Sequence, residues 1–565
     1  MNKIIEKIKE ISNYKYFVPI FVVIVNLIFF IICNLIFELK YETVDDFMMM
    51  KLISKVDGEY SIYGVFIHPV ICALVMFLFK TGINVNWYTV FLLAMQFVAF
   101  CTIGINLINK NKKYGICFYL VIISLIYPQI LTAINFTSTA TVVLIAGVST
   151  IMFDAKKSFR ILGYCLISIG LMLRWATLAL VIPFYIIYSI YNVISKREYK
   201  YINRIIILFF LIVLTYSTNL LIYNFNPSIK KYMQFNSLRS YFFDKNVLDY
   251  DKNKLLFEEN NWSKNDYELF YTYSYGDENF YTTENLSNLK SQIHESKGEI
   301  LEKIYKGFIY FYKLNTLSFS ILLVIVMLLL LLALQNKKKL SIVSLIVIAF
   351  FALNYYLCFT KPVYRVIISL YESTIILILN VLIDDKKNVN NNKFEIIILI
   401  AIVLLTIFNS INIYNSHKKN NIQDYNLKRN IIDYASQNKQ NAYVYTSVLG
   451  NISLAYNVYE KPKDNSFDNM RHMGDWDAYD KQYYVFKNKY NIDNIITDLY
   501  KKENLFLIDG DSFGADNIIR KNHIEIIIKY IKEHYNVDVD YKIIKEFENT
   551  NAKIYKLFEQ NKSQY

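Results

Sequence analysis

The chain of 565 residues is 54% hydrophobic and 16% aromatic, and it contains only 15 glycines and 7 prolines. This composition excludes an intrinsically disordered chain and an ordinary soluble enzyme. The formal net charge of +13 raises the question of nucleic acid as a partner, but the basic residues cluster in short loops between apolar runs, which is typical of membrane topology instead.

The first apolar run, 17–37, follows Lys3, Lys7, Lys9 and Lys15 and is long enough to span a bilayer. No small-residue cleavage site follows it, so we predict an uncleaved signal anchor with a cytoplasmic N-terminus. Further runs that reach or approach spanning length are 87–108, 114–130, 134–153, 161–173, 175–191, 205–223, 314–334, 340–359, 366–383 and 395–413. We therefore predict an α-helical polytopic membrane protein with about eleven transmembrane helices.

Basic residues cluster in the loops that follow alternate runs, and such clusters mark the cytoplasmic side. The clusters are Lys110, Lys112 and Lys113; Lys156, Lys157 and Arg160; Lys196, Arg197 and Arg204; Lys337 to Lys339; and Lys386, Lys387 and Lys393. They share one side only if the run 65–79 does not cross the membrane. We predict for that run an interfacial or re-entrant helix on the outer face, covered by other protein.

Three polar segments then face outward: 38–64, 224–313 and everything after Tyr414. We predict a membrane domain, 1–414, with outer loops 38–86 and 224–313, and an extracellular α/β domain, 415–565. In this tail, strand-like segments, a helical segment and a hairpin lie at 442–448, 504–508, 524–534 and 541–558. A polar partner is therefore expected to meet the protein outside the cell.

The first outer loop contains the string Tyr41-Glu42-Thr43-Val44-Asp45-Asp46-Phe47, directly after the first span. The segment 48–55 that follows has the spacing of a short amphipathic helix lying at the outer surface. A carboxylate at this boundary between water and membrane can take the proton from an acceptor hydroxyl during group transfer. The structural alternative is that Thr43 or Asp45 caps the helix, whose dipole favours acidic residues at its start.

The acidic pair is followed by Phe66-Ile67-His68-Pro69-Val70 and an apolar stretch that ends near Asn86-Trp87. This layout resembles the first outer loop of the GT-C glycosyltransferases, among them the protein O-mannosyltransferases and the lipid A aminoarabinose transferases. More narrowly, the acidic string resembles uncharacterised Gram-positive membrane proteins. The resemblance implies a polyprenyl-phosphate sugar as donor, Asp45 or Asp46 as catalytic base, and His68 beside the substrate. A single Pro69 stands where mannosyltransferases have two prolines, so sugar and acceptor stay open.

A phosphate leaving group needs cations to hold it. Arg174 ends the fifth span on the outer side, where similar transferases carry a Lys or Arg; the structural alternative is snorkelling beside Trp175. Lys361 and Arg365 lie in a short outer loop, and a guanidinium suits bidentate phosphate contacts. Glu372 follows Arg365 by two helical turns, so a structural ion pair is the alternative there.

Other outer segments offer weaker candidates. Phe235, Leu238 and Phe242 have helical spacing, so the helix could roof a cavity and turn Asn236 and Arg239 toward substrate, with packing as the alternative. Trp262 is a candidate for stacking on an acceptor sugar, and the alternative is a helix start at Asn265 and Asp266. The hydroxyl-rich segment 135–139 is a candidate ligand contact, with ordinary N-capping as the alternative.

Cofactor signatures are weak. The chain has 6 scattered His, and the segment Arg471 to Asp477 lacks a second ligand cluster. Asp45 and Asp46 could hold a divalent cation, but a monophosphate donor does not require one, so we predict no metal and no cofactor. The absence of a P-loop and of a glycine-rich nucleotide fingerprint argues against nucleotide sugars or ATP as direct substrates.

These features predict an inverting GT-C-type hexosyltransferase of the cell membrane. A polyprenyl-phosphate sugar donates, Asp45 or Asp46 activates an acceptor hydroxyl, and Arg174 and Arg365, with Arg239 as a further candidate, hold the phosphate. The acceptor is a cell-envelope glycan, a lipid or a protein. The alternative is a non-catalytic carrier or flippase for a lipid-linked saccharide, or an envelope assembly protein; ion-driven carriers place acidic or His groups at mid-membrane, and these spans have almost none.

Overall fold

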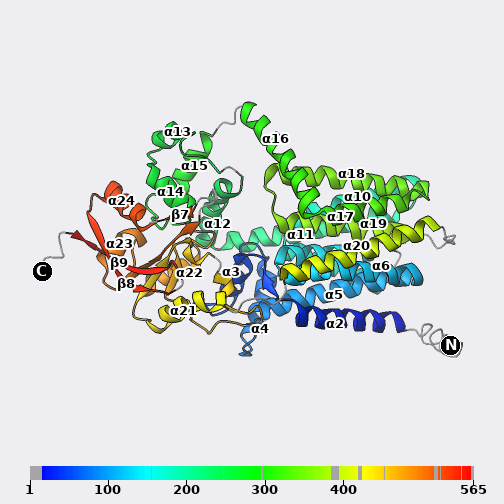
Figure 1. Cartoon of the computed structure of the whole chain (residues 1–565), viewed down its shortest axis with the longest axis horizontal. Helices are drawn as coiled ribbons and strands as arrows, with labels where there is room; N and C mark the ends of the chain where they lie inside the picture. Colours follow the sequence, from blue (N-terminus) through cyan, green and yellow to red (C-terminus); the bar gives the residue numbers. More distant parts are fainter. Residues whose placement is uncertain are drawn as a thin grey trace.

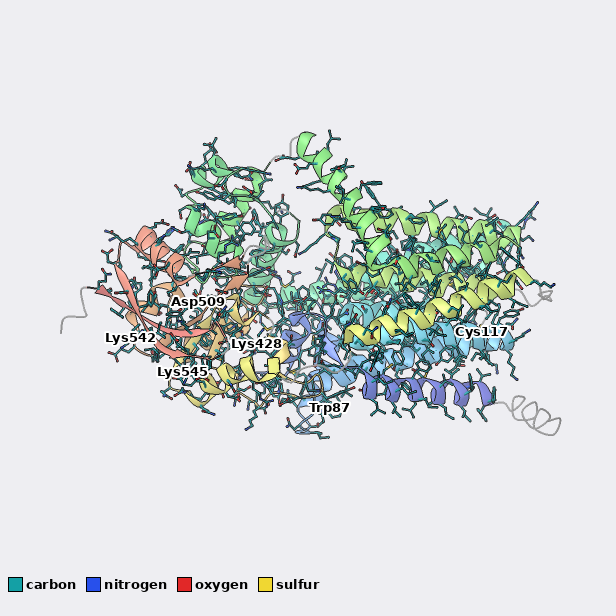
Figure 2. All side chains as sticks on the ribbon, in the orientation of Figure 1. Trp87, Cys117, Lys428, Asp509, Lys542 and Lys545 are labelled. Atoms are coloured by element: carbon teal, nitrogen blue, oxygen red, sulfur yellow. The ribbon has the colours of Figure 1, made fainter. Side chains whose placement is uncertain are left out.

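A computed structural model describes residues 16–153, 156–245, 247–293, 297–383, 393–417, 423–450, 452–513, 519–521, 523–548 and 550–560. The predicted basic flank Lys3, Lys7, Lys9 and Lys15, together with Lys386 and Lys387, lies outside the described residues. A bundle of long helices forms one half of the molecule and a sheet-containing region forms the other (Figure 1). Cys117 lies within the bundle, Trp87 and Lys428 near the junction, and Asp509 in the sheet-containing half (Figure 2).

All eleven predicted apolar runs form helices, because a segment in lipid must satisfy its backbone hydrogen bonds within itself. They are α2 (Phe17–Ile36), α5 (Trp87–Lys110), α6 (Lys112–Leu125) with α7 (Tyr127–Thr132), α8 (Phe136–Met152), α9 (Lys157–Leu173), α10 (Leu178–Lys196), α11 (Lys200–Phe225), α17 (Ser320–Ala333), α18 (Lys337–Thr360), α19 (Tyr364–Ile383) and α20 (Lys393–His417). Among the described residues, 8 helices are long and apolar enough to cross a membrane, or up to 9 if one pair bent by 87° is a single span. The protein is thus a multi-pass helical membrane protein.

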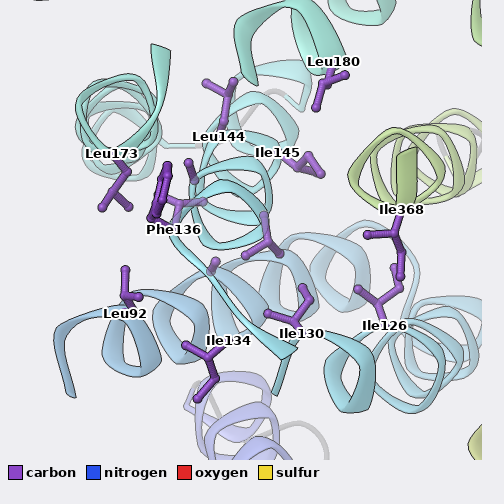
Figure 3. Close-up of a cluster of buried hydrophobic side chains, with 14 of the residues drawn as sticks. Leu92, Ile126, Ile130, Ile134, Phe136, Leu144, Ile145, Leu173, Leu180 and Ile368 are labelled. Atoms are coloured by element: carbon purple, nitrogen blue, oxygen red, sulfur yellow. The ribbon is translucent and has the colours of Figure 1, made fainter. Parts of the chain in front are cut away.

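The helix α8 is the centre of the bundle, and every one of its residues is buried. Its Leu144 and Ile145 lie among apolar side chains of the neighbouring helices, including Leu173, Leu180 and Ile368 (Figure 3). A Cβ added at Gly147 would come within 2.6 Å of the carbonyl oxygen of Gly163 on α9. Glycine at this crossing therefore allows the close helix approach that packing within a membrane requires.

The predicted surface helix at 48–55 is instead the buried helix α3 (Val44–Ile53), in which every residue from Asp46 to Ile53 is buried. The prediction of a helix lying at the surface is wrong, because residues from the C-terminal part of the chain cover α3. Phe47 stacks on Tyr456 with ring centres 5.7 Å apart and meets Phe467 edge-on. Just before α3, the strand β1 (Lys40–Tyr41) pairs in parallel with β2 (Ala133–Ile134). This pairing fixes the start of α3 against the start of α8.

The run 65–79 forms the short helix α4 (Pro69–Phe79), which begins after the N-cap residue His68. Its 11 residues extend only about 17 Å, roughly half the thickness of the hydrocarbon core. The helix lies at the junction of the two halves of the molecule (Figure 1). Its length agrees with the prediction of a segment that does not cross the membrane.

The segment after α11 forms a small aromatic-rich layer of short helices. These are α12 (Pro227–Ser240), α13 (Lys254–Glu259), α14 (Lys264–Tyr271), α15 (Thr283–Ser291) and α16 (Lys297–Lys313). Trp262 is 1% exposed and packs among Phe257, Phe270 and Tyr281. Trp262 is therefore a core residue, and the prediction that it stacks on an acceptor sugar is wrong.

The C-terminal half contains a five-stranded sheet of order β4-β3-β5-β9-β8. The strands are β3 (Ala442–Tyr445), β4 (Met470–His472), β5 (Leu505–Asp509), β8 (Val539–Glu546) and β9 (Lys553–Glu559), and the helices are α21 (Gln423–Gln437), α22 (Lys481–Lys489), α23 (Ile495–Lys501) and α24 (His523–Tyr535). The predicted strands, helix and hairpin are confirmed. The parallel strand β4 was missed because it has only 3 residues. The helix α20 continues past the predicted domain boundary at Tyr414 to His417.

Candidate functional site

The carboxylate of Asp45 and the guanidinium of Arg365 meet at the junction of the two halves. Asp45 lies in the first turn of α3 and Arg365 in the first turn of α19, and Nη2 of Arg365 is 3.1 Å from Oδ2 of Asp45. Both side chains keep some contact with the surface, with exposed fractions of 18% and 19%. Two polar groups predicted separately, 320 residues apart in sequence, thus share one site.

The alternative pairing of Arg365 with Glu372 does not occur. Glu372 is 1% exposed within α19, and neither of its carboxylate oxygens has a hydrogen-bond partner among the described residues. Arg365 instead turns toward the first outer loop. It pairs there with Asp45 and also acts electrostatically on Glu42.

Arg174 supplies a second guanidinium beside this pair. It ends α9, and its guanidinium lies 5.0 Å from the ring centre of Phe66 and 5.4 Å from that of Phe136. Within the described part of the chain it has no ion-pair or hydrogen-bond partner, although both Arg365 and Asp45 act on it electrostatically. Burial, aided by the charge of Arg365, lowers the pKa of Arg174 to about 10. At neutral pH the group is therefore a cation without a counter-ion, which is a suitable place for an anion.

The C-terminal half covers the other side of Asp45. Nε1 of Trp476 donates a hydrogen bond of 3.2 Å to Oδ1 of Asp45, and its ring meets Phe66 edge-on at 5.2 Å. Sequence reasoning considered the segment around Trp476 only as a metal site and missed this contact. No local signal could have found it, because the two residues lie 431 positions apart.

Arg239 is buried and contacts Asp475, the residue before Trp476. Its Nε donates to Asn236, and its Nη1 is 3.7 Å from Oδ1 of Asp475. Burial raises the pKa of Asp475, and Arg239 opposes that rise. Arg239 and Asn236 therefore help to hold the loop that carries Trp476, and a role of Arg239 in phosphate binding stays a prediction.

The two candidate bases have different surroundings. Asp46 is fully buried, and its Oδ1 accepts hydrogen bonds of 2.8 Å from the hydroxyl of Tyr88 and 2.9 Å from the backbone N–H of Phe136. Burial raises the pKa of Asp46 well above its usual range. Asp46 thus ties α3 to the start of α8, whereas Asp45 faces the two guanidinium groups. The alternative that the Thr43 side chain caps α3 is not confirmed. Thr43 occupies the N-cap position, but its side chain makes no capping hydrogen bond.

Three further candidates form no hydrogen bond or ion pair with Asp45 or Arg365 among the described residues. His68 caps α4, where its Nδ1 accepts from the N–H of Val70, and its Nε2 lies 3.2 Å from the hydroxyl of Thr218 on α11. Lys361 forms a half-exposed ion pair of 2.6 Å with Asp244. Asn135 caps α8 by accepting from the N–H of Ser138. These contacts fit structural roles for His68 and Asn135 and a surface position for Lys361.

Glu42 is a member of the site that the sequence reasoning did not single out. Burial raises its pKa from an ordinary value of 4.5 to about 7, and Arg365 opposes that rise through its charge and its backbone N–H. One carboxylate oxygen of Glu42 is buried without a hydrogen-bond partner among the described residues. Glu42 is thus a carboxyl group that titrates near neutral pH, next to the Asp45–Arg365 pair.

This pKa predicts how stability depends on pH. Because the folded protein holds the Glu42 proton up to about pH 7 and the unfolded chain only up to about 4.5, the contribution of this group to stability falls as pH rises between these values. We expect Glu42→Gln to raise the unfolding temperature by a few degrees at about pH 8 and to leave it unchanged at about pH 4. The measurement is thermal unfolding in detergent.

Glu59→Gln is the matched control for the pH experiment, because Glu59 is 48% exposed and pairs with Lys481 at the surface. Its effect should be small and nearly independent of pH. An equal gain from Glu42→Gln at both pH values would contradict the assigned burial.

One group among the described residues could hold a metal ion, and it lies outside this site. It consists of Asp266, Glu533 and His534, at the contact of α14 with α24. His534 lies 2.7 Å from Asp266, whose carboxylate also accepts from the N–H of Ser263 as part of a capping box. These bonds give the group a structural role, because they join α14 to α24 of the C-terminal region.

Neither the family models nor the curated proteins include a match to this chain. Among solved structures, the crystal structure of ArnT from Cupriavidus metallidurans bound to undecaprenyl phosphate is similar, with a TM-score of 0.39 and 6% sequence identity. The similarity covers 96% of this chain and 98% of that chain. A likeness of this size assigns no role to any residue here, so the roles proposed below rest on the contacts of the site.

Proposed function

We propose that this protein is a membrane glycosyltransferase that transfers a sugar from a polyprenyl-phosphate donor to an acceptor hydroxyl on the extracellular face. The observation that carries the proposal is the guanidinium of Arg174, which has no ion-pair or hydrogen-bond partner among the described residues and is acted on electrostatically by the Asp45–Arg365 pair. A carboxylate and two cations at the end of a helix bundle combine the base and the anion site that transfer from a lipid phosphate needs. The resemblance of the first outer loop to GT-C transferases points the same way.

In the proposed reaction the phosphate of the donor lies between Arg174 and Arg365. Binding of the phosphate draws Arg365 away from Asp45, which frees the carboxylate to accept a proton. The acceptor oxygen then attacks the anomeric carbon from the face opposite the phosphate, so the configuration inverts. The bond from the anomeric carbon to the phosphate oxygen breaks, the acceptor proton goes to Asp45, and polyprenyl phosphate leaves with its charge held by the two guanidinium groups.

The orientation that we propose has the N-terminus in the cytoplasm and the sheet-containing half outside. The N-terminal end of α2 lies at the end of the bundle farthest from the sheet (Figure 1). The basic loops between α5 and α6, between α10 and α11 and between α17 and α18 follow helices that run away from the site, and basic loops favour the cytoplasm. The lipid-linked donor then reaches Asp45 at the outer headgroup level.

We propose that the acceptor approaches over the outer layer. A cavity of about 660 Å³ there is lined by aromatic and polar side chains of α12 and α22, among them Tyr232, Tyr484 and Asn488. The hydroxyl of Tyr232 donates to the backbone oxygen of Trp476, whose ring donates to Asp45. Aromatic walls with a few polar groups are typical of small-molecule sites, and this one is connected to the proposed base through a single residue.

A carrier for a lipid-linked saccharide is the second candidate, and Glu372 is the observation that favours it. A carboxyl group buried within a membrane helix without a hydrogen-bond partner among the described residues is costly, and such groups mark ion or proton pathways in carriers. The two candidates differ in whether the bond between sugar and phosphate is broken.

The proposal is tested with purified protein in vesicles that contain undecaprenyl phosphate carrying a radiolabelled hexose, together with a cell-envelope extract as acceptor. We expect label to move to the extract and free undecaprenyl phosphate to appear in equal amount, in proportion to the protein added. Vesicles with heat-inactivated protein are the control. Movement of intact donor between leaflets without bond cleavage would establish the carrier instead, and binding of no lipid phosphate at all would overturn both.

A further inference from the structure

A second cavity, of about 480 Å³, is connected to the Asp45–Arg365 pair through Glu42, on which both residues act electrostatically. It is enclosed by the first outer loop, by α7 and by the ends of α17, α19 and α20 that face the sheet-containing half. Glu42 lines it from the loop, and Tyr364, the residue before Arg365, lines it from α19. Its volume falls within the range of ordinary small-molecule sites.

Four buried polar atoms in the cavity lining have no hydrogen-bond partner among the described residues. They are Oε2 of Glu42, Oε1 of Gln129, Nδ2 of Asn409 and Nδ1 of His417. Asn409 is only 8% exposed. Leaving one buried donor or acceptor unsatisfied costs about 1–3 kcal/mol, so unsatisfied groups are rare and need an explanation. Their concentration around one cavity indicates a polar ligand.

The kinds of atom identify the chemistry of this ligand. The oxygen of Gln129 only accepts hydrogen bonds, the amide nitrogen of Asn409 only donates them, and the Glu42 carboxyl, with a pKa of about 7, accepts when ionised and donates when protonated. An anion would meet the amide oxygen of Gln129, and a metal ion would meet the amide N–H of Asn409. The described residues also place no three metal-ligating side chains together at this cavity. A neutral ligand with several hydroxyl groups, which both donate and accept, satisfies the whole set.

We infer that this cavity binds the sugar ring of the donor, with Glu42, Gln129 and Asn409 as the residues that select it. The inference rests on the proposed function and adds to it a place and a set of contacts for the sugar. Hydroxyl groups of Thr132, Ser318 and Ser416 line the same cavity and add further polar contacts.

The position of the cavity fits the proposed reaction. Arg365 points its guanidinium at Asp45, and its neighbour Tyr364 lines the cavity. A sugar in the cavity with its phosphate on Arg365 has its anomeric carbon at the border between the two, within reach of an acceptor activated by Asp45. Asn412 and Ser416 are exposed at the rim, so the cavity opens to the surface of the bundle.

The inference is tested by comparing binding of bare undecaprenyl phosphate with binding of the same lipid phosphate carrying glucose, galactose, mannose or N-acetylglucosamine, in lipid nanodiscs. The wild-type protein is expected to bind at least one glycosylated lipid about tenfold more tightly than the bare lipid, a gain that one or two buried hydrogen bonds supply. Gln129→Leu and Asn409→Leu should abolish this preference and change the Kd for the bare lipid less than twofold.

Folding is controlled in the same experiment. Because neither side chain has a hydrogen-bond partner among the described residues, replacing them with leucine of similar size should leave the unfolding temperature unchanged or higher. Asn106→Leu is the matched control: Asn106 is buried in the bundle and donates 2.8 Å to Thr150, so this variant should unfold earlier and keep the sugar preference.

The outcomes separate the inference from the proposed function. If bare and glycosylated lipids bind the wild-type protein equally, or if both leucine variants keep the preference, the cavity is not the sugar site although the function stands. If no lipid phosphate binds, the proposed function itself fails.

Discussion

Replacing Asp45 with asparagine is expected to lower the rate of sugar transfer by about 10²- to 10⁴-fold, the range that a positioned general base contributes. Asparagine keeps the size of the side chain and can still accept the hydrogen bond from Trp476, but it cannot take the acceptor proton. Binding of the polyprenyl-phosphate donor should be retained, because the phosphate is held by Arg174 and Arg365. The measurement is kcat for label transfer beside the Kd for the donor.

Asp46→Asn is the matched control for this experiment. The neighbouring residue undergoes the same chemical change, but Asp46 is fully buried, and this burial raises its pKa and so favours the uncharged form that asparagine resembles. Asparagine can accept the same bonds from Tyr88 and the N–H of Phe136, so activity and unfolding temperature should change little. Loss of transfer in Asp46→Asn with full activity in Asp45→Asn would reverse the assignment of the base, and full activity in both variants would refute a carboxylate base in this loop.

The sequence predicted the helices of the bundle well because the bilayer imposes a strong rule: a run of about twenty apolar residues has few structures available other than a helix. The burial of α3 could not be predicted from the sequence, because it depends on which distant segment packs on the helix. The side chains that enclose Phe47 come from Tyr456 and Phe467, in a part of the chain that local periodicity does not connect to the first loop. A helix that carries Asp46 and Lys51 is expected to expose one face, so its burial on all sides could not be predicted from local spacing.

Only part of the site was predicted from the sequence, and the reason is similar. Asp45, Arg174 and Arg365 are charged residues at the ends of apolar runs, and such charges are costly enough near lipid to be noticed one by one. Trp476 and Gln129 carry no such signal, because an aromatic side chain in a loop and a single amide near the end of an apolar run are ordinary. Glu42 was part of the acidic string, but only the fold shows that one of its oxygens is buried and faces a cavity.

The partner of Arg365 distinguishes the two interpretations that the sequence left open for this residue, a structural ion pair with Glu372 and a place in the site. Arg365 had two available acids, Glu372 on its own helix and Asp45 on a distant loop, and it pairs with the distant one. That choice leaves Glu372 without a hydrogen-bond partner among the described residues. Both Arg365 and Asp45 also act electrostatically on Arg174, so two guanidinium groups lie near one carboxylate, an arrangement that suits a phosphate.

Arg365→Ala is expected to lower the transfer rate by about 10²- to 10³-fold, the loss typical of removing one group that stabilises developing charge. The guanidinium faces the departing phosphate in the proposed reaction, and its charge also restrains the pKa of Glu42, which should rise further above about 7 in this variant. Arg365→Lys should recover part of the rate, because an ammonium keeps the charge and loses the bidentate geometry. Steady-state kinetics across pH, with kcat and KM resolved, measures both effects.

Lys361→Ala tests whether any cation in this loop can hold the donor phosphate, or only Arg365. Lys361 lies four residues before Arg365 and forms an ion pair with Asp244 in which both side chains are about half exposed. Exposed pairs contribute little, so its removal should change the rate by less than about threefold. A loss from Lys361→Ala as large as that from Arg365→Ala would show that the loop attracts the donor through its general positive charge. The proposed contact between one guanidinium and one phosphate would then be wrong, because only a specific contact distinguishes two cations this close in sequence.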